Sequence, residues 1–365
     1  MRIAYFLTWH DGVGRGVLEK VSDQVGFWIS EGHSVRVFVV THHTSRNDFQ
    51  YAVSGSRVRG FRTSLGSIVA QGQALKDLKT FAPDIIYLRP SLRNLWLLRF
   101  FPTVPLIAEV QTNDLVESRL KSRLRFILTR FARRSLNRAD GLVFVSNELA
   151  KAPEFASFSP TRITIGNGID LSRVQTARRR ETAGPISFML LSSAEVPWHG
   201  IDHVLSIAQA RTNWEFHIVG DIPAPSLSPP NVRFHGFQEA EGIVEIARDV
   251  DLGIGSLGLY RKGMEEASPL KVRSYLAMGL PVVAAYRDTD LGEDSDMFLQ
   301  LPNIPNALVA YSDEVERFAM TWRGSRIPRD DLTAIDSRVK EPERLAFFER
   351  VISLTSCEGQ RYRNE

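Results

Sequence analysis

Residues 251–285 read DLGIGSLGLYRKGMEEASPLKVRSYLAMGLPVVAA and contain a complete strand–loop–helix–strand unit. An apolar run at 251–257 predicts a strand, and LPVVAA at the end of the segment predicts the next one. Between them, Ser268 has the side chain of a helix N-cap, Pro269 suits the first helical position, and Gly279 ends the helix. This order of elements indicates a parallel sheet that is covered by helices.

The same alternation extends in both directions along the chain. Further strands are predicted at 2–7, 35–40, 85–88, 104–110, 141–146, 186–192, 215–220 and 231–236. These runs are rich in Val, Ile and Leu, as expected for strands that are buried on both faces. Helices are predicted from Val17 to about Ser30 and over 341–354. We therefore expect an α/β protein with two Rossmann-like, doubly wound parallel-sheet domains.

A polar stretch at 172–185, SRVQTARRRETAGP, interrupts the alternation and is interpreted as a linker. The expected divisions are an N-terminal Rossmann-like domain at 1–172, a linker at 173–185, a C-terminal Rossmann-like domain at 186–340, a helix at 341–356 that crosses back to the N-terminal domain, and a tail at 357–365. Ligands of open parallel sheets bind beyond the carboxyl ends of the strands, so functional residues are expected in the loops there.

The formal net charge of +3 conceals an uneven distribution. Residues 1–172 carry 23 basic and 14 acidic side chains, whereas residues 173–365 carry 22 and 28, which predicts two bodies with different partners. No apolar run is long enough to span a bilayer, and the first residues lack the pattern of a signal peptide. The single cysteine, Cys357, excludes a disulfide framework. A cytoplasmic protein is expected.

A glycine-rich loop, GVGRG at 12–16, follows the first predicted strand. Glycines there let backbone amides approach a phosphate at a helix N-terminus. The dinucleotide-binding spacing is incomplete because residue 17 is Val, and the second strand ends in Val40-Thr41-His42 without a carboxylate. A tight turn without a ligand is the alternative interpretation.

A second candidate site lies in the loop before the helix predicted at 270–278. The helix N-terminus, with Lys262 or Lys271 as cation, is suited to a diphosphate. Glu265 and Glu266 beside an anion are costly unless they bind hydroxyl groups, so the combination favours a sugar nucleotide over a bare phosphate. Alternatively, the two acids only complement the helix dipole.

In their order and spacing, several segments resemble those of retaining GT-B glycosyltransferases, glycosyltransferase family four (glycosyl transferases group 1). They are the Gly loop before SEGHSVRVF, ADGLVFVSNELA, ITIGNGID, WHGIDHVL, FHIVGD, NVRFHGF and EEASPLKVRSYLAMGLPVV, and they extend to about residue 355. The resemblance implies two domains facing a central cleft. It also implies sugar transfer, with retention, from a nucleoside diphosphate sugar to a hydroxyl of a glycan or lipid-linked acceptor in cell-surface polysaccharide or glycoconjugate synthesis.

The resemblance also implies roles for individual residues. Glu266 matches the first Glu of the Glu-x7-Glu motif and would contact the transferred sugar. From its place in the loop, Lys262 is the second predicted catalytic residue and is expected to stabilise the leaving diphosphate. Ser274 stands where the second Glu is expected. Its hydroxyl cannot replace a carboxylate that accepts two hydrogen bonds, so weaker donor binding or a different donor is expected. The other donor-binding residues are expected to be Gly14, Gly16, His199, Phe237, Ser268, Pro269, Leu270 and Lys271.

On the acceptor side, the resemblance points to Gln111 and Asn113, which follow the strand at 104–110. Gln111 stands where the family often has a His and cannot act as a titrating base. The Asp-x-Asp spacings at 249–251 and 288–290 are interpreted as ordinary acidic positions. No metal and no other cofactor is expected.

The stretch SRLKSRLRFILTRFARRSLNR at Ser118–Arg138 contains eight basic residues and no acid. The residues predicted to line one helical face are Leu120, Leu124, Ile127, Leu128 and Phe131. A basic amphipathic helix can lie on an anionic membrane, which suggests peripheral attachment to the inner face of the cell membrane. No nucleic-acid-binding motif accompanies it, so nucleic acid is not expected as a partner. A core-packed helix with a solvated basic face is the alternative.

Two other function classes are considered. The Ser274 and Gln111 departures fit a catalytically weakened transferase-like protein that acts as a binding or assembly partner. The Gly loop also fits a dinucleotide oxidoreductase, although the missing acid after the second strand argues against it. A weakened transferase-like protein would not turn over UDP-, GDP- or ADP-sugars, whereas an active glycosyltransferase would. A dinucleotide oxidoreductase would bind NAD(P).

Overall fold

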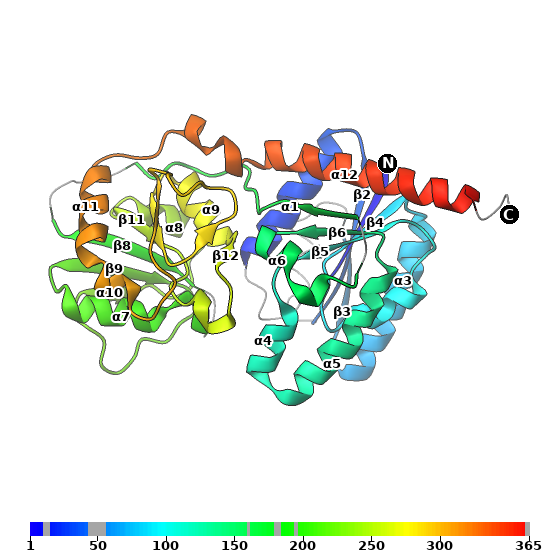
Figure 1. Ribbon diagram of the computed structural model, residues 1–365, viewed down its shortest axis with the longest axis horizontal. Helices are drawn as coiled ribbons and strands as arrows, with labels where there is room; N and C mark the ends of the chain where they lie inside the picture. Colours follow the sequence, from blue (N-terminus) through cyan, green and yellow to red (C-terminus); the bar gives the residue numbers. More distant parts are fainter. Residues whose placement is uncertain (10–14, 43–55, 159–160, 179–183, 193–195, 362–365) are drawn as a thin grey trace. The chain divides into compact units, whose positions relative to one another are not determined.

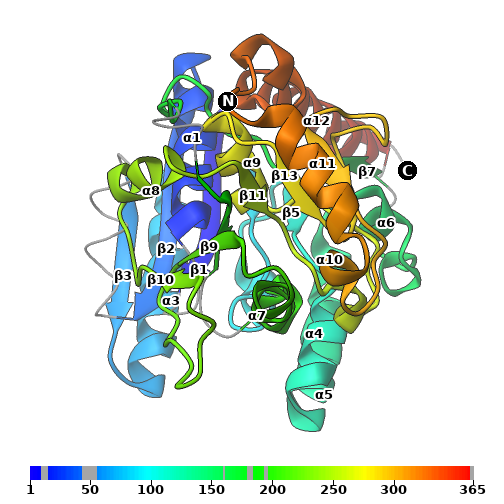
Figure 2. The same ribbon diagram turned by 90° about the vertical axis from the view of Figure 1, so that its left-hand side faces the viewer.

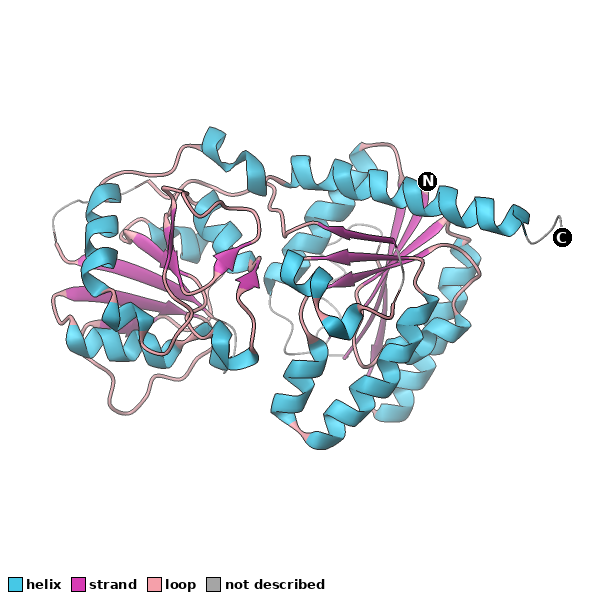
Figure 3. Ribbon diagram, viewed as in Figure 1, coloured by secondary structure: helices cyan, strands magenta, loops and turns pink. Residues whose placement is uncertain are grey.

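The computed structural model describes the chain apart from residues 10–14, 43–55, 159–160, 179–183, 193–195 and 362–365. The chain divides into two compact units. Unit 1 comprises Met1–Gly166 with Ser337–Glu365, and unit 2 comprises Asn167–Asp336. Each unit contains a parallel sheet flanked by helices (Figures 1 and 3). The prediction of two Rossmann-like α/β domains is confirmed.

The boundary between the units lies after Gly166, whereas the sequence placed the end of the first domain at residue 172. Backbone hydrogen bonds explain the difference. Ile169 N–H donates to Ile335 O, and Ala177 N–H donates to Met278 O. The start of the expected linker is therefore held within unit 2.

In unit 1, the described strands form a seven-stranded sheet in the order β3-β2-β1-β4-β5-β6-β7, with every pairing parallel. The strands are β1 Arg2–Trp9, β2 Ser34–His42, β3 Arg57–Phe61, β4 Ile85–Leu88, β5 Leu106–Val110, β6 Gly141–Phe144 and β7 Thr161–Thr164. Continuous apolar runs such as Ile85–Leu88 are buried along their whole length, because helices cover both faces of the sheet.

One face of this sheet packs against α1 (Arg15–Ser30) and α12 (Ser337–Arg361), which contact each other. Alternate residues of β1, such as Ile3 and Tyr5, join Trp28 and Phe348 in that core. The remaining helices of unit 1 are α3 Ser64–Phe81, α4 Asp114–Lys121, α5 Arg123–Arg133, α6 Asn147–Lys151 and the short 3₁₀ helices η2 Leu95–Phe100, η3 Arg134–Arg138 and η4 Pro153–Phe155.

In unit 2, the described strands form a six-stranded parallel sheet in the order β10-β9-β8-β11-β13-β15. A separate parallel pair joins β12 to β14. The strands are β8 Ile186–Leu191, β9 Trp214–Val219, β10 Val232–Phe234, β11 Leu252–Ile254, β12 Glu266–Ala267, β13 Val282–Ala284, β14 Arg287–Asp288 and β15 Phe298–Gln300.

The helices of unit 2 are α7 Ile201–Ala210, α8 Ala240–Ala247, α9 Leu270–Ala277, α10 Ala307–Ala310, α11 Ser312–Trp322, and the 3₁₀ helices η5 Pro197–His199, η6 Leu259–Lys262 and η7 Arg329–Ile335. Helices α7 and α10 lie side by side (Figure 2). Helix α9 packs closely on β11, since a Cβ at Gly253 would come within 2.5 Å of the Tyr275 ring. This contact holds α9 against β11 and thereby positions the N-terminus of the helix.

Both strand orders reverse direction beside their first strand, between β1 and β4 in unit 1 and between β8 and β11 in unit 2. Loops leaving such a reversal diverge to opposite faces of the sheet and leave a crevice that binds ligands in proteins of this architecture. No helix among the described residues is long and apolar enough to cross a membrane.

Candidate functional site

In unit 2, the loops beyond β8 and β11 bring together three of the predicted cationic or titratable residues. His199 ends η5 after β8, Lys262 ends η6 after β11, and Lys271 lies in the first turn of α9. Elements η5 and η6 contact each other, and Gly258 N–H donates to Trp198 O. The structure therefore places these three side chains beside the strand reversal of this unit.

Lys262 and His199 are both held by neighbours. The Lys262 Nζ lies 4.6 Å from the centre of the Trp198 ring, in a cation–π contact, and its side chain is buried. The His199 Nδ1 lies 2.6 Å from Ser192 Oγ. Burial, together with the positive charges of Lys271 and Lys262, lowers the pKa of His199 to about 2. The imidazole is therefore neutral and available as a hydrogen-bonding group.

Lys271 is the least satisfied member of this group. Its Nζ is buried and has no hydrogen-bond partner within the described part of the chain. Burial lowers the pKa of the Lys271 ammonium to about 7. A buried ammonium without a counter-charge destabilises a fold, and no counter-charge to Lys271 lies within hydrogen-bonding distance among the described residues.

Glu266 lies in β12, next to this cationic group in the sequence, and is 3 % exposed. Strand β12 pairs with β14, which places Arg287 beside it, and Arg287 Nη2 lies 3.6 Å from Glu266 Oε2. Glu265, its neighbour in sequence, is exposed. The structure therefore buries one carboxylate of the predicted pair and leaves the other in solvent.

The predicted helix cap is wrong by one residue. Pro269 is the N-cap, and α9 starts at Leu270, because the backbone of Pro269 is extended with ψ of 136°. The Ser268 hydroxyl accepts instead from Asn167 N–H and Arg273 Nη2, both at 2.7 Å. Ser268 therefore anchors the loop, and the first amides of α9, at Leu270 and Lys271, are the donors that lack acceptors within the helix.

Ser274, at the position of the second motif Glu, lies one turn further along α9. Its hydroxyl donates to Leu270 O at 3.2 Å. The side chain can therefore still accept a hydrogen bond from a ligand hydroxyl, but its donor is already committed to the helix. Phe237 follows β10 and is 59 % exposed.

In unit 1, Gly16 lies in the first turn of α1, and Gly14 lies outside the described residues. Asn113 is the N-cap of α4, where its Oδ1 accepts from Val116 N–H at 3.4 Å. Gln111 follows β5, and its Oε1 lies 3.5 Å from Lys20 Nζ. The Gln111 Nε2 is buried with no hydrogen-bond partner in the described structure, so its amide can donate to a ligand.

Sequence reasoning missed a buried ionic cluster under these acceptor-side residues. Glu109 pairs with Lys20 at 2.7 Å and with Arg344 at 3.4 Å, and all three side chains are buried. Burial opposes the ionisation of Glu109, but the charges of Lys20, Arg344 and Arg89 outweigh it and hold its pKa at about 2. The sequence signal that could have revealed this cluster is the Glu inside the apolar strand LIAEV, because a buried charge requires a partner.

The acidic pairs with Asp-x-Asp spacing have structural partners. Asp251 accepts from Ser187 N–H at 3.0 Å, and Asp288 receives two hydrogen bonds from the buried Arg273 guanidinium at 2.9 Å. Within the described ranges, no three His, Cys, Asp or Glu side chains form a group suited to a metal ion.

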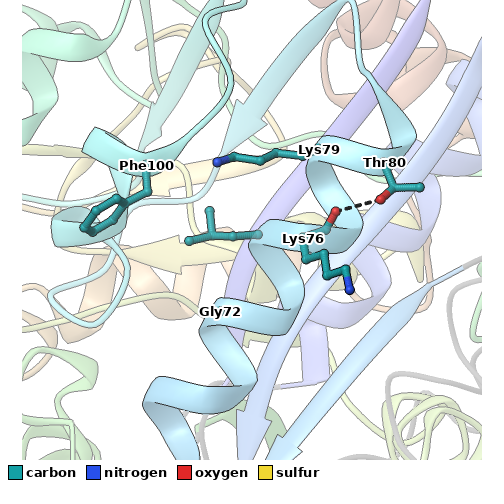
Figure 4. A pocket seen from close by; sticks show the side chains of 6 residues that line it. Gly72, Lys76, Lys79, Thr80 and Phe100 are labelled. Carbon is teal, nitrogen blue, oxygen red and sulfur yellow. Dashed lines mark hydrogen bonds between the residues drawn. The ribbon is translucent and has the colours of Figure 1, made fainter.

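A shallow pocket of about 620 Å³ lies elsewhere in unit 1, between α3 and η2 (Figure 4). Its lining residues are Gly72, Leu75, Lys76, Lys79, Thr80 and Phe100. None of the predicted site residues contributes to it.

Residues 14–173 match the sequence profile of Glycosyltransferase Family 4. No curated protein matches the chain in sequence. Among solved structures, sucrose-phosphate synthase from Thermosynechococcus elongatus is similar, with 13 % identity, a TM-score of 0.70, and coverage of 97 % of this chain and 99 % of that chain.

HepE from Anabaena, crystallised with UDP and glucose, has 15 % identity, a TM-score of 0.69, and coverage of 96 % and 100 %. The lipopolysaccharide outer core galactosyltransferase WaaB, in its apo form, has 13 % identity, a TM-score of 0.62, and coverage of 97 % and 100 %. The structural neighbours show the fold, and the profile match over residues 14–173 supports the glycosyltransferase class. The resemblance found in the sequence is confirmed, and the chain is a glycosyltransferase of the GT-B type.

Proposed function

We propose that unit 2 binds a nucleoside diphosphate sugar and that the enzyme transfers the sugar to a hydroxyl of a glycan or lipid-linked acceptor. The observation that carries this proposal is the buried Lys271 Nζ, which has no hydrogen-bond partner in the described structure and lies close enough to His199 to lower its pKa. Lys262 contributes a second positive charge. A diphosphate would supply a counter-charge to the Lys271 ammonium.

Each residue of the site has a role in the proposed reaction. As the bond between the sugar and the diphosphate breaks, negative charge grows on the leaving group. Lys262, Lys271 and the first amides of α9 stabilise that charge. His199, held neutral, donates a hydrogen bond without adding a further charge. The buried Glu266 carboxylate accepts hydrogen bonds from sugar hydroxyls and orients the ring.

The donor base and the reaction type are also part of the proposal. HepE was crystallised with UDP and with UDP-glucose, so uridine donors are the first to test. Retention of configuration, and a place in cell-surface polysaccharide or glycoconjugate synthesis, follow from the resemblance. We propose that transfer needs no metal, because Asp251 and Asp288 already bind backbone and guanidinium groups. Transfer that survives a chelator would support this part.

On the acceptor side we propose Gln111, whose buried Nε2 has no hydrogen-bond partner among the described residues and can donate to an acceptor oxygen. Asn113 is assigned to the same side, although its Oδ1 already caps α4. Gly14, Gly16 and Phe237 remain predictions for donor binding. A lipid-linked acceptor would place the enzyme at the inner face of the cell membrane.

The test is Glu266→Ala, with Glu265→Ala as the matched control. Transfer is measured with a panel of UDP-, GDP- and ADP-sugars. The Glu266 variant should lose about 10²-fold or more in kcat/KM, because a transition-state contact is removed. The Glu265 variant changes an exposed neighbour of the same type and should stay within about threefold. A near-wild-type rate in Glu266→Ala would refute this site.

A catalytically weakened transferase-like protein is the second candidate. The observation that favours it is the Ser274 hydroxyl, whose donor is bound within α9. This candidate predicts that UDP raises the melting temperature while no donor sugar turns over. Measurable transfer with any donor in the panel rules it out.

A further inference from the structure

Helices α4 and α5 expose an apolar, basic surface that the donor chemistry does not use. The sequence predicted one helix across Ser118–Arg138, but the structure divides it. Ser122, with φ of −171°, ends α4 and caps α5, and its hydroxyl accepts from Arg125 N–H at 3.1 Å. The two helices pack against each other as a hairpin.

The buried face of α5 is polar. Thr129 Oγ1 lies 2.8 Å from Ser118 Oγ, which ties α5 to α4. The Arg133 guanidinium is buried 4.2 Å from the centre of the Phe155 ring and pairs with Asp114 at 3.3 Å. Thr129 and Arg133 are four residues apart and share one face of the helix. The two fully buried residues of α5 are therefore polar, and Phe126 on the same side of the helix is half-buried.

The outward face of α5 is apolar. Its large side chains are exposed: Leu124 by 67 %, Ile127 by 41 %, Leu128 by 49 % and Phe131 by 58 %, with Leu120 at the end of α4 exposed by 59 %. On a helix of 3.6 residues per turn, the four α5 residues share the face opposite Thr129 and Arg133. The alternative of a core-packed helix with a solvated basic face is therefore wrong. A contiguous exposed patch of this kind marks an interaction surface.

Exposed arginines flank this apolar stripe. Arg123 and Arg130 of α5, with Arg134 at the start of η3, lie along one edge, and Arg125 lies toward the other. All four are exposed. Helix α5 contains no acidic residue. Arg134 also stacks over the Phe131 ring at 4.8 Å, so a positive charge lies directly beside the apolar stripe. The partner must accept apolar side chains and guanidinium groups together.

We propose that the outer face of the α4–α5 hairpin docks on an anionic lipid bilayer, with the apolar stripe among the acyl chains and the arginines on the lipid phosphates. The geometry suits an interfacial helix, because arginine side chains can reach headgroups while their helix lies at the acyl boundary. A second copy of this chain fits less well, since a self-paired face would bring like charges together. This inference deepens the proposed membrane location and requires no transferase activity.

The neighbouring surface adds positive charge. Element η2 contacts α5, and its last residue, Phe100, is exposed. Phe100 lines the pocket that also contains Lys76 and Lys79 of α3 (Figure 4). Arg99 stacks over the Phe100 ring at 4.8 Å. Together, these side chains extend the basic, apolar surface beyond the hairpin.

The test uses the full-length protein and vesicles of phosphatidylcholine with about 30 mol % phosphatidylglycerol, compared with phosphatidylcholine alone. Binding is measured by co-sedimentation at about 0.05 M and about 0.5 M salt. The wild type should bind the anionic vesicles and lose most of this binding at high salt. Failure to bind anionic vesicles at low salt overturns the proposal.

Two variants locate the surface. Leu124→Glu/Leu128→Glu should lower the partition coefficient at least about tenfold, and Arg123→Gln/Arg130→Gln about tenfold at low salt. The matched controls change exposed residues of unit 2 and α12, namely Leu227→Glu/Met320→Glu and Arg317→Gln/Arg350→Gln. They should remain within about twofold of wild type. Equal losses in the controls and in the α5 variants would contradict the assignment.

Insertion is measured separately from charge attraction. The single cysteine, Cys357, is exposed, so Cys357→Ser/Leu128→Cys provides one labelling position for an environment-sensitive dye. The emission at position 128 should shift to the blue with anionic vesicles, and a label on Cys357 of the wild type should not. No shift at position 128 overturns the proposal. A dimer in sedimentation velocity that Leu124→Glu/Leu128→Glu dissociates also overturns it, in favour of a second copy.

UDP binding by every variant serves as the functional control. If a variant loses vesicle binding but still binds UDP, the change affects the docking surface and not the donor site. If the protein binds vesicles but not UDP, the proposed donor site is contradicted and the docking surface is not.

Discussion

Unit 1 and unit 2 each bury a group of charged side chains, but they do so in opposite ways. In unit 1, Lys20, Glu109, Glu341 and Arg344 combine two positive and two negative charges in direct contact. In unit 2, His199, Lys262 and Lys271 combine only basic groups. The first arrangement pairs opposite charges within the protein, whereas in the second the Lys271 Nζ has no hydrogen-bond partner among the described residues.

The unit 1 cluster is held by hydrogen bonds as well as by charge, although Glu109 Oε2 and Arg344 Nη2 have no hydrogen-bond partner among the described residues. Arg344 Nη1 donates to Tyr87 Oη at 2.7 Å, and Trp28 Nε1 donates to Glu341 Oε2 at 2.9 Å. These contacts attach α12 to α1 and to the sheet. Buried charges of this kind stabilise a particular packing only while every partner is present. We therefore interpret the unit 1 charges as structural and propose a ligand-binding role for Lys271 in unit 2.

Arg344→Met should disrupt the paired charges of unit 1 and give the largest effect. The variant leaves Glu109 and Glu341 buried without their guanidinium and should lower the free energy of unfolding by about 3–5 kcal/mol. Urea unfolding measures it, with Arg350→Met, an exposed position on the same helix, as control. The deficit should shrink toward pH 3, because Glu109 can then take up a proton. Equal stabilities for the two variants would contradict the structural role.

Lys271→Met should have the opposite effect on stability. Burial lowers the pKa of Lys271 from 10.5 to about 7, so its ammonium costs folding free energy that the thioether does not. We expect a gain of roughly 2–4 kcal/mol near neutral pH and a loss of UDP affinity of about 10²-fold. Thermal unfolding and calorimetry measure the two effects. A variant that is less stable than wild type would show that Lys271 is a structural residue.

The pH dependence of donor binding sharpens the same contrast. Free Lys271 loses its proton as the pH rises through about 7, whereas a bound diphosphate holds the proton on it. Affinity for UDP-glucose should therefore fall above pH 7, by up to about tenfold per pH unit, with proton uptake on binding. Calorimetry in buffers of different ionisation enthalpy measures the uptake. Lys271→Met should abolish it, and uptake that persists in this variant must come from another group.

Ser274→Glu should give the smallest effect. If Ser274 occupies the position of the second motif carboxylate, glutamate there can accept from two donor hydroxyls, and donor affinity should rise by about threefold to tenfold. Ser274→Gln is the control, because it matches the size of glutamate without its charge. Tighter binding in the Gln variant alone would show that length, and not charge, is what the position lacks.

Much of the fold and part of the site could be predicted from sequence. Strand β4 was placed at its observed residues, 85–88, because a fully buried strand is one uninterrupted apolar run. Strand β3, RVRGF at Arg57–Phe61, was not predicted, because this edge strand contains two arginines and a glycine and only Val58 is buried. Glu266 and Lys271 were identified because they lie beside a helix start, a signal confined to a few residues. Arg344 was not identified, because its partner Glu109 lies 235 residues earlier in the sequence and only folding brings the two together.

The sequence by itself determined the two Rossmann-like units, the glycosyltransferase class and the loop that contains Glu266. Hydrophobic periodicity and short motifs depend only on residues that are close together in the sequence. The tertiary structure alone decided which charges are paired. It showed that Ser268 binds Asn167 instead of capping α9, and that Lys271 is buried without a partner in the described structure. It also turned the apolar face of α5 outward. Burial depends on what packs against a side chain, and those neighbours come from distant parts of the chain.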